Sequence, residues 1–196
     1  MTLTTESSRR AVTEWPLIEI LAERWSPRAY DKTAVIEEAT LTTVLEAARW
    51  APSASNMQPS RFIVARRGSA NFTKIHDALK GFNQVWADTA SVLIVNVAKL
   101  SIDETRENPW ARYDLGQAVA HLTIQAQHEG LHTHQMGGFD AAAIADAFNL
   151  NDDQAVVTVT ALGVLGQPED LTPELQEREI APRIRKPLAE LLLAND

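Results

Sequence analysis

The chain has 196 residues, of which 45% are hydrophobic, and it carries a formal net charge of -8 at pH 7. This length and composition fit one globular domain with a substantial core. The acidic balance and the dispersed basic residues argue against a nucleic-acid-binding protein. The absence of cysteine excludes disulfides, thiolate nucleophiles and thiolate-bound metal centres, so redox chemistry would require a bound cofactor.

Hydropathy gives no sign of a membrane or secreted protein. No apolar run reaches the roughly 18 residues that span a bilayer, and the N-terminal MTLTTESSRR lacks the apolar region of a secretory signal. We therefore expect a cytoplasmic protein. Residues 1–13 are rich in Ser, Thr and charge, which predicts an N-terminal extension that is either disordered or lies on a neighbouring subunit. Residues 14–196 are predicted to form a single domain.

The apolar pattern predicts alternating helices and strands. Leu41, Val44 and Leu45 have helical spacing, whereas the β-branched run 91–98 predicts a strand that is buried on both faces. A long helix should end at Gly130. In chain order, we expect helices near 16–24 and 41–50, a strand near 61–66, a helix near 69–80, a strand near 91–98, helices near 110–129 and 140–148, a strand near 155–166, and helical patches after Pro168. This is an α+β pattern.

Two segments place arginines at alternate positions. An extended Arg24-Trp25-Ser26-Pro27-Arg28 would have Arg24, Ser26 and Arg28 on one side, and Arg183 and Arg185 repeat this spacing near the C-terminus. In an acidic chain, guanidinium groups gathered at one spot indicate a bound anion. The first segment, taken alone, is more often a solvated helix end, where the helix dipole favours Arg.

Two polar loops follow apolar elements. Pro52-Ser53-Ala54-Ser55-Asn56 lies between the helix near 41–50 and the strand near 61–66, and Met136-Gly137-Gly138-Phe139-Asp140 precedes the helix near 140–148. Each loop alone could be a local turn, with Asp140 capping the helix that follows it.

Taken together and in this order, the Glu46–Val64 run, both arginine segments and the Gly137–Asp140 turn resemble the FMN-dependent nitroreductase family. The resemblance extends from about Ile18 to Leu193. It implies a three-layer α-β-α fold, with a central, mostly antiparallel sheet flanked by helices, and a homodimer with the long helix in its core. It also implies FMN as cofactor and NADH or NADPH as a transient electron donor.

The implied activity is reduction of nitroaromatics, quinones or similar acceptors by a ping-pong mechanism. The donor would bind only transiently on the flavin face that the acceptor later occupies, so no Rossmann fingerprint is required. Two alternatives remain open: an oxygen-using flavin oxidase of the same fold, and a flavin-binding redox sensor without turnover. The chain departs from many relatives at Trp25, Ser60 and Gly137, so no relative's substrate is carried over. Residues 102–112, Phe82 and Trp86 are the expected discriminators between acceptors.

By the same resemblance, Arg24, Ser26, Arg28 and Arg185 would bind the phosphate and ribityl end, and Arg183 would lie nearer the ring. Backbone N–H groups of Gly137 and Gly138 would donate to flavin N5 and form the catalytic element. The polar loop would reach the flavin of the partner subunit. In full, the expected cofactor-binding residues are Arg24, Trp25, Ser26, Arg28, Pro52, Ser53, Ala54, Asn56, Asn83, Met136, Gly137, Gly138, Arg183 and Arg185.

The neighbouring sequence alone does not decide the role of Asn83 or of the three histidines at 128, 132 and 134. Asn83 could contact the isoalloxazine ring, as the family spacing implies, or it could be an ordinary turn residue after Gly81. His128 and His132 are four residues apart, but Gly130 breaks the helical context between them, and no acidic partner lies close to these residues or to His134, so we predict no metal site there.

Overall fold

The protein is described by a computed structural model that covers residues 9–194. Four strands form one antiparallel sheet in the order β1-β2-β4-β3. Their bounds are Ser60–Arg66 for β1, Val92–Lys99 for β2, His132–Met136 for β3 and Gln154–Gly163 for β4.

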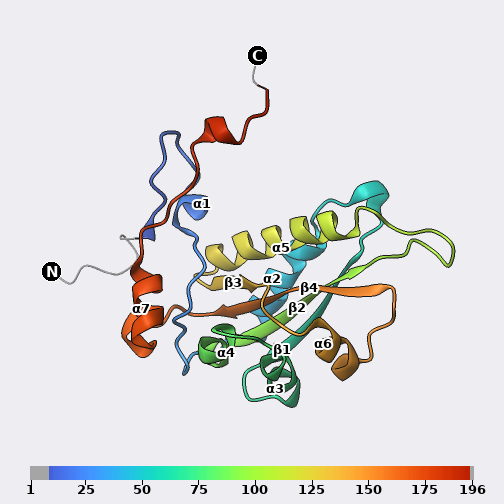
Figure 1. The fold of residues 1–196 in the computed structure, drawn as a ribbon, viewed down its shortest axis with the longest axis horizontal. Helices are drawn as coiled ribbons and strands as arrows, with labels where there is room; N and C mark the ends of the chain where they lie inside the picture. Colours follow the sequence, from blue (N-terminus) through green and yellow to red (C-terminus); the bar gives the residue numbers. More distant parts are fainter. Residues whose placement is uncertain (1–8, 195–196) are drawn as a thin grey trace.

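Helices cover both faces of this sheet (Figure 1). On one face lie α2, Glu38–Arg49, and α5, Ala111–His128. On the other lie α3, Ala70–Asp77, α4, Asn83–Trp86, and α6, Ala141–Phe148. The predicted three-layer α-β-α architecture with an antiparallel sheet is therefore confirmed.

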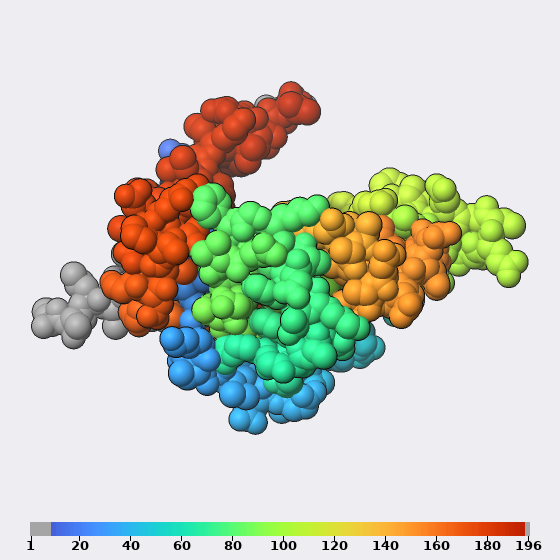
Figure 2. Space-filling model, turned by 60° about the horizontal axis from the view of Figure 1, so that its bottom comes forward, coloured from blue at the N-terminus to red at the C-terminus, as the bar shows by residue number. Residues whose placement is uncertain are grey.

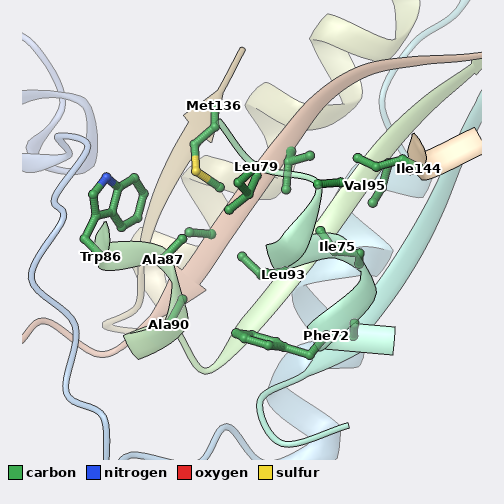
Figure 3. Packing of buried hydrophobic residues seen from close by; sticks show 14 of the residues in the cluster. Phe72, Ile75, Leu79, Trp86, Ala87, Ala90, Leu93, Val95, Met136 and Ile144 are labelled. Atoms are coloured by element: carbon green, nitrogen blue, oxygen red, sulfur yellow. The ribbon is translucent and has the colours of Figure 1, made fainter. Parts of the chain in front are cut away.

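The central position of β2 in the sheet, with helices on both faces, explains why its sequence is apolar almost throughout. Leu93 and Val95 pack into the core under α3, α4 and α6, whereas Val92 and Ile94 pack against α2 and α5. All four side chains are completely buried. Figure 3 shows the first of these cores, with Leu93 and Val95 among the labelled side chains. Burial of each large aliphatic side chain contributes about 1.5–3 kcal/mol.

Helix α5 crosses one face of the sheet. Its residues Leu115, Ala118, Leu122 and Ala126 are buried against the sheet and α2. The helix ends as expected before Gly130, whose φ of 73° is easily adopted by glycine. Its first turn also anchors the polar loop after α2, because Asp114 accepts a hydrogen bond from the Ala54 N–H.

Several boundaries differ from the sequence-based expectations. Strand β3 was not predicted, because its sequence HTHQM is short and mostly polar. It is an edge strand that pairs with β4, so polar side chains are tolerated there. The helix expected near 16–24 is shortened to α1, Glu19–Glu23, and α3 ends three residues before the expected position. Strand β4 ends at Gly163 rather than near 166.

The C-terminal part leaves the body of the molecule. After α7, Pro173–Ile180, the chain runs beside the N-terminal segment and away from the sheet (Figure 1). Figure 2 shows it as a projection from the molecular surface. The short 3-10 turns are η2, Ala54–Asn56, η3, Ala87–Thr89, η4, Pro168–Asp170, and η5, Leu188–Glu190. Between residues 9 and 194, no helix has the length and apolar character needed to cross a membrane.

Residues 1–8 of the predicted N-terminal extension lie outside the described residues. Residues 9–13 are described, and Arg9 and Ala11 bond to other parts of the chain.

Candidate functional site

Three of the four predicted arginines lie together. Arg24 follows α1, and its Nη2 donates to Ser26 Oγ at 3.4 Å. Burial, together with the positive charge of Arg185, lowers the pKa of the Arg24 guanidinium. The pKa of Arg183 is lowered by burial and by the charges of Arg24, Arg185 and Arg9. These guanidinium groups therefore repel one another, and a bound anion would relieve that repulsion.

The arginine cluster also contains a buried hydrogen-bond donor that has no acceptor among the described residues. Arg24 Nε is buried and has no hydrogen-bond partner among the described residues. A buried donor without a partner costs free energy, so its presence favours a ligand that accepts a hydrogen bond. A phosphate group fits this requirement, because its oxygens accept hydrogen bonds and carry negative charge.

Arg183 and Arg185 are held differently. Arg183 Nη1 donates to the carbonyl oxygens of Arg9 at 2.6 Å and Ala22 at 2.9 Å, so its guanidinium is fixed against α1 and the N-terminal segment. The exposed Arg185 donates to the carbonyl of Ile184. Arg183 is thus the more rigid of the two positive groups.

Arg28 has a different partner from the one expected. Its Nη1 lies 3.5 Å from Oε2 of Glu179, a buried residue of α7. Glu179 Oε1 also accepts the backbone N–H groups of Arg28 at 2.8 Å and Ala29 at 3.0 Å. In the protomer, Arg28 therefore joins this segment to α7. No sequence pattern singled out Glu179, which stands among other charged residues of a polar helix.

His134 links strand β3 to the arginine segment. Its ring lies 2.8 Å from the Pro27 carbonyl oxygen, so Nδ1–H donates, and the ring packs on Trp86 with centroids 4.7 Å apart. Burial is the main cause that lowers the pKa of His134 to about 4, and the positive charges of Arg28 and Arg24 contribute. The histidine is neutral at pH 7. No pattern in the sequence indicated this contact between His134 and Pro27.

The glycine turn follows β3, and Asn83 lies beside it. Asn83 Nδ2 donates to the Gly138 carbonyl at 3.1 Å, and the Lys80 N–H donates to the same oxygen at 2.9 Å. A Cβ added at Gly137 would meet no heavy atom within 4 Å, so the space beside this residue is open. The Met136 side chain is buried in the core (Figure 3), so only its main chain can face a ligand.

A cavity of about 360–370 Å³ in volume, the size of a small-molecule site, lies on each side of α5. One is lined by Arg24, Gln135 and a face of α5 that includes Gly116, Ala120 and Thr123. Gln135 Nε2 donates to Thr123 Oγ1 at 2.8 Å, so it joins β3 to the helix. Sequence reasoning did not single out Gln135.

The other cavity adjoins the polar loop after α2, and Pro52 and Ser53 are among the residues that line it. The Ala54 N–H donates to Asp114 Oδ2 at 3.1 Å, and the Gln58 N–H donates to Ser53 Oγ at 3.0 Å. Ser55, Asn56 and Gln58 have φ values of 49°, 56° and 49°. Such left-handed conformations of residues other than glycine cost free energy and often occur at functional sites.

The loop and the arginines are separated within one protomer. Asp114 anchors the loop at the first turn of α5, whereas α1 and Arg24 lie further along the same helix. Figure 1 shows η2 and α1 near opposite ends of α5. Asn83, the glycine turn and the arginines lie along the β3 edge, and the residues 52–56 lie elsewhere.

The histidine trio does not gather into a metal site. His132 is buried in β3, His134 is bonded to Pro27, and His128 ends α5. Within residues 9–194, no group of three or more His, Asp or Glu side chains could hold a metal ion.

The model of the nitroreductase family matches residues 21–85 and 69–164 of this chain. The chain belongs to the nitroreductase family. A protein of Mycolicibacterium smegmatis, described as an uncharacterized 15.4 kDa protein in the ask 5' region, is 38% identical over 139 residues, covering 67% of this chain and 92% of that protein. The major NAD(P)H-flavin oxidoreductase of Aliivibrio fischeri is 32% identical over 119 residues, covering 58% of this chain and 51% of that protein.

Among solved structures of similar proteins, an oxidoreductase containing FMN has 33% sequence identity and a TM-score of 0.90. The match covers 99% of this chain and 98% of that one. The nitroreductase fold is therefore shared over nearly the whole length, including the segments that carry the arginines and the glycine turn.

Proposed function

We propose that this nitroreductase-family protein is an FMN-dependent oxidoreductase that uses NADH or NADPH to reduce nitroaromatic, quinone or similar planar acceptors. The observation that carries the proposal is the cluster of Arg24, Arg183 and Arg185 around a buried Arg24 Nε without a partner among the described residues. The similarity to an FMN-containing oxidoreductase and to an NAD(P)H-flavin oxidoreductase supports it.

The residues present fit FMN at both of its ends. Arg24 and Arg185 would hold the phosphate, with Ser26 as a further hydrogen-bonding group. Arg183 was expected nearer the ring, but it lies close enough to the charges of Arg24 and Arg185 to join the phosphate end. At the ring end, the open space beside Gly137 allows the main chain to approach a flat ligand. Asn83 is fixed beside this turn by its bond to Gly138, so its side chain is already positioned there.

When bound, FMN would supply the hydride-accepting and hydride-donating chemistry. The chain's own contribution is to orient it, through the arginines at one end and the turn at the other. A backbone N–H of Gly137 or Gly138 would donate to flavin N5 and stabilise negative charge that develops on the ring. Donor and acceptor would then use the same ring face in turn, which gives ping-pong kinetics. A cytoplasmic location stays a prediction.

The separation of the two halves supports a homodimer with a composite site. Within one protomer, the loop of Pro52, Ser53, Ala54 and Asn56 bonds to the first turn of α5, whereas α1, which precedes Arg24, lies near the other end of that helix. A partner subunit would bring its loop to this protomer's flavin. The exposed apolar side chains of the C-terminal part also need a covering surface. These side chains are Ile184, Leu188, Leu191, Leu192 and Leu193.

The phosphate end is tested by comparing FMN with riboflavin, which lacks the phosphate. The double variant Arg24→Ala/Arg185→Ala should lose at least about 100-fold in FMN affinity, because two charge-assisted contacts disappear. Its riboflavin affinity should stay within about twofold of the wild-type value. Fluorescence titration of apoprotein with each flavin measures both quantities. An unchanged preference for FMN would contradict the assignment of these arginines.

The composite site is tested by mixing two inactive variants. Arg24→Ala/Arg185→Ala damages one half of each site, and Ser53→Ala/Asn56→Ala damages the other half. If the halves come from different subunits, a heterodimer of the two variants contains one intact site and one doubly damaged site. Mixing should therefore restore part of the flavin binding. No recovery in demonstrated heterodimers would show that both halves belong to one chain.

A further inference from the structure

Three consecutive residues of the N-terminal segment are bonded to other parts of the chain. The Ala11 N–H donates to the Ala22 carbonyl at 2.8 Å, and Arg10 forms ion pairs with Glu19 and Glu23, all around α1. Arg9 Nη1 donates to the Ala181 carbonyl, just after α7. Figure 1 shows the N-terminal and C-terminal segments side by side in this region. We call residues 9–11 the strap.

The strap covers Trp25, the residue between Arg24 and Ser26. The guanidinium carbon of Arg9 lies 4.2 Å from the centroid of the Trp25 ring, which is a cation-π contact. Arg9 Nε is buried and has no partner within the described part of the chain. Burial is the main cause that lowers the pKa of Arg9. The side chain is therefore held by stacking, by one carbonyl and by the attraction of Glu179, at a cost in desolvation.

The main chain of the strap holds Arg183. The Arg9 carbonyl is one of the two oxygens that accept from Arg183 Nη1, and Ala22 supplies the other. Arg183 lies close enough to Arg24 and Arg185 to be repelled by both. Fixed carbonyl oxygens oppose that repulsion, because their negative ends face the guanidinium. Without the strap, Arg183 would keep one of these two acceptors.

We propose that the strap positions Arg183 and Trp25 for cofactor binding, and that Arg9 is a positioning residue for the phosphate end of the flavin site. The inference rests on the proposed function, because the anion in question is the phosphate of FMN. It assigns a role to residues 9–11, which lie upstream of the segments matched by the family model. The strap would act by keeping several positive groups close together before the anion arrives, which lowers the cost of organising the site on binding.

Two full-length variants test the strap, each with a matched control. Arg9→Ala removes the stacking group, and its control Lys74→Ala removes the same charge and a cation-π contact with Phe148, on α3 and outside the strap. Ala11→Pro removes the N–H that bonds to Ala22 without changing charge. Its control is Val12→Pro, at a residue that is 97% exposed.

The readout is the ratio of FMN affinity to riboflavin affinity, together with the melting temperature of the apoprotein. Arg9→Ala and Ala11→Pro should each lower the FMN affinity about tenfold, whereas riboflavin affinity and both controls stay within about twofold. A purely structural role would weaken both flavins alike. Equal losses for FMN and riboflavin, or no loss in either strap variant, would overturn the inference.

Arg9→Lys separates positioning from simple charge. Lysine keeps the positive charge but not the planar group that stacks on Trp25, so it should not restore the FMN preference. Full restoration by lysine would overturn the positioning role.

The test also separates this inference from the proposed function. If Arg24→Ala/Arg185→Ala loses the FMN preference while both strap variants keep it, only the strap inference fails. If the double variant itself keeps the preference, the phosphate site of the proposed function fails as well.

Discussion

Gly137 and Gly138 are adjacent and chemically identical, yet the structure gives them different neighbours. A Cβ at Gly138 would stand 3.0 Å from Asn83 Nδ2, whereas a Cβ at Gly137 would meet nothing within 4 Å. Neither residue has a positive φ, so alanine strains neither backbone. The first glycine therefore leaves room for a ligand, and the second leaves room for Asn83.

Alanine substitutions should separate these two roles. Gly138→Ala pushes Asn83 from its bond to Gly138 and should lower the melting temperature of the apoprotein by about 3 °C, as expected for about 1 kcal/mol in a domain of this size. Gly137→Ala should leave that temperature within about 1 °C but should weaken FMN binding, since the methyl group enters the ligand's space. Calorimetry and flavin titration measure the two effects. Equal temperature shifts would contradict this distinction.

His134 makes stability depend on pH. Its pKa is about 4 in the folded chain and 6.5 in the unfolded chain, so between these values the unfolded chain binds more protons. Stability from this residue is complete above pH 6.5 and is lost as the pH falls toward 4. The difference between these pKa values corresponds to about 3 kcal/mol of unfolding free energy.

The variant His134→Asn should remove this dependence. Asparagine does not titrate in this range, and its side-chain amide can still donate to the Pro27 carbonyl. We expect the wild type to exceed the variant in unfolding free energy by most at pH 7, with the difference shrinking toward pH 4.5. Urea denaturation at each pH measures it. A difference that is constant with pH would show that His134 does not titrate as described.

Only part of the site could be predicted residue by residue. Arg24, Arg183 and Arg185 were found from their alternate spacing, and the structure places their charges together. Glu179 and His134 could not be found that way, because each acts on a backbone group far away in the chain: Ala29 in one case and Pro27 in the other. Such partners are set by tertiary packing, which leaves no local pattern.

At the scale of elements, the loop between α2 and β1 depends on α5. Its Ala54 N–H bonds to Asp114, a carboxylate that is 2% exposed, and its next residues have left-handed backbones. A loop with such conformations persists only where neighbouring groups hold it. Asp114 is therefore expected to preform the segment that would reach the partner's flavin.

Asp114→Ala should destabilise the protein by about 1–3 kcal/mol, because the Ala54 N–H loses its charged acceptor. Hydrogen exchange at residues 53–58 should become faster. The control is Glu46→Ala, an exposed carboxylate of α2 paired with Arg49 beside the same cavity, for which a solvent-screened ion pair predicts a much smaller loss of stability. Unchanged exchange in the Asp114 variant would show that the loop is held by other contacts.

Elements with long, mostly apolar sequences were the predictable ones. The strand near 91–98 and the helix near 110–129 match β2 and α5 closely, because both are packed from several sides. Strand β3 was not predicted, because an edge strand needs few apolar residues. Its HTHQM sequence makes contacts with Thr123, Pro27 and β4, which are distant in the sequence or leave no local pattern. The edge on which the candidate site lies is thus the part least visible in the sequence.

At the scale of the whole molecule, η2 and α1, beside the two parts of the proposed site, lie near opposite ends of α5, and the apolar C-terminal part projects from the body. The proposed dimer would account for both features, because the partner subunit would supply the loop and would cover the apolar C-terminal residues. The alternation of helices and strands predicted an α+β fold, and the resemblance to the family implied its three layers. The course of the C-terminal part was not, because its apolar residues lack a partner within their own chain that would set a pattern.

The central claim is that the protein transfers electrons from a nicotinamide to an aromatic acceptor through FMN. The most direct test is anaerobic mixing of the FMN-loaded protein with NADPH, and separately with NADH, while the absorbance of the oxidised flavin is followed. We expect the absorbance of the oxidised flavin to fall rapidly with at least one donor and to recover when a quinone or nitroaromatic is added. A flavin that stays oxidised with both donors would contradict the proposed activity and favour a redox sensor. Bleaching that is reversed by oxygen and not by these acceptors would favour an oxidase.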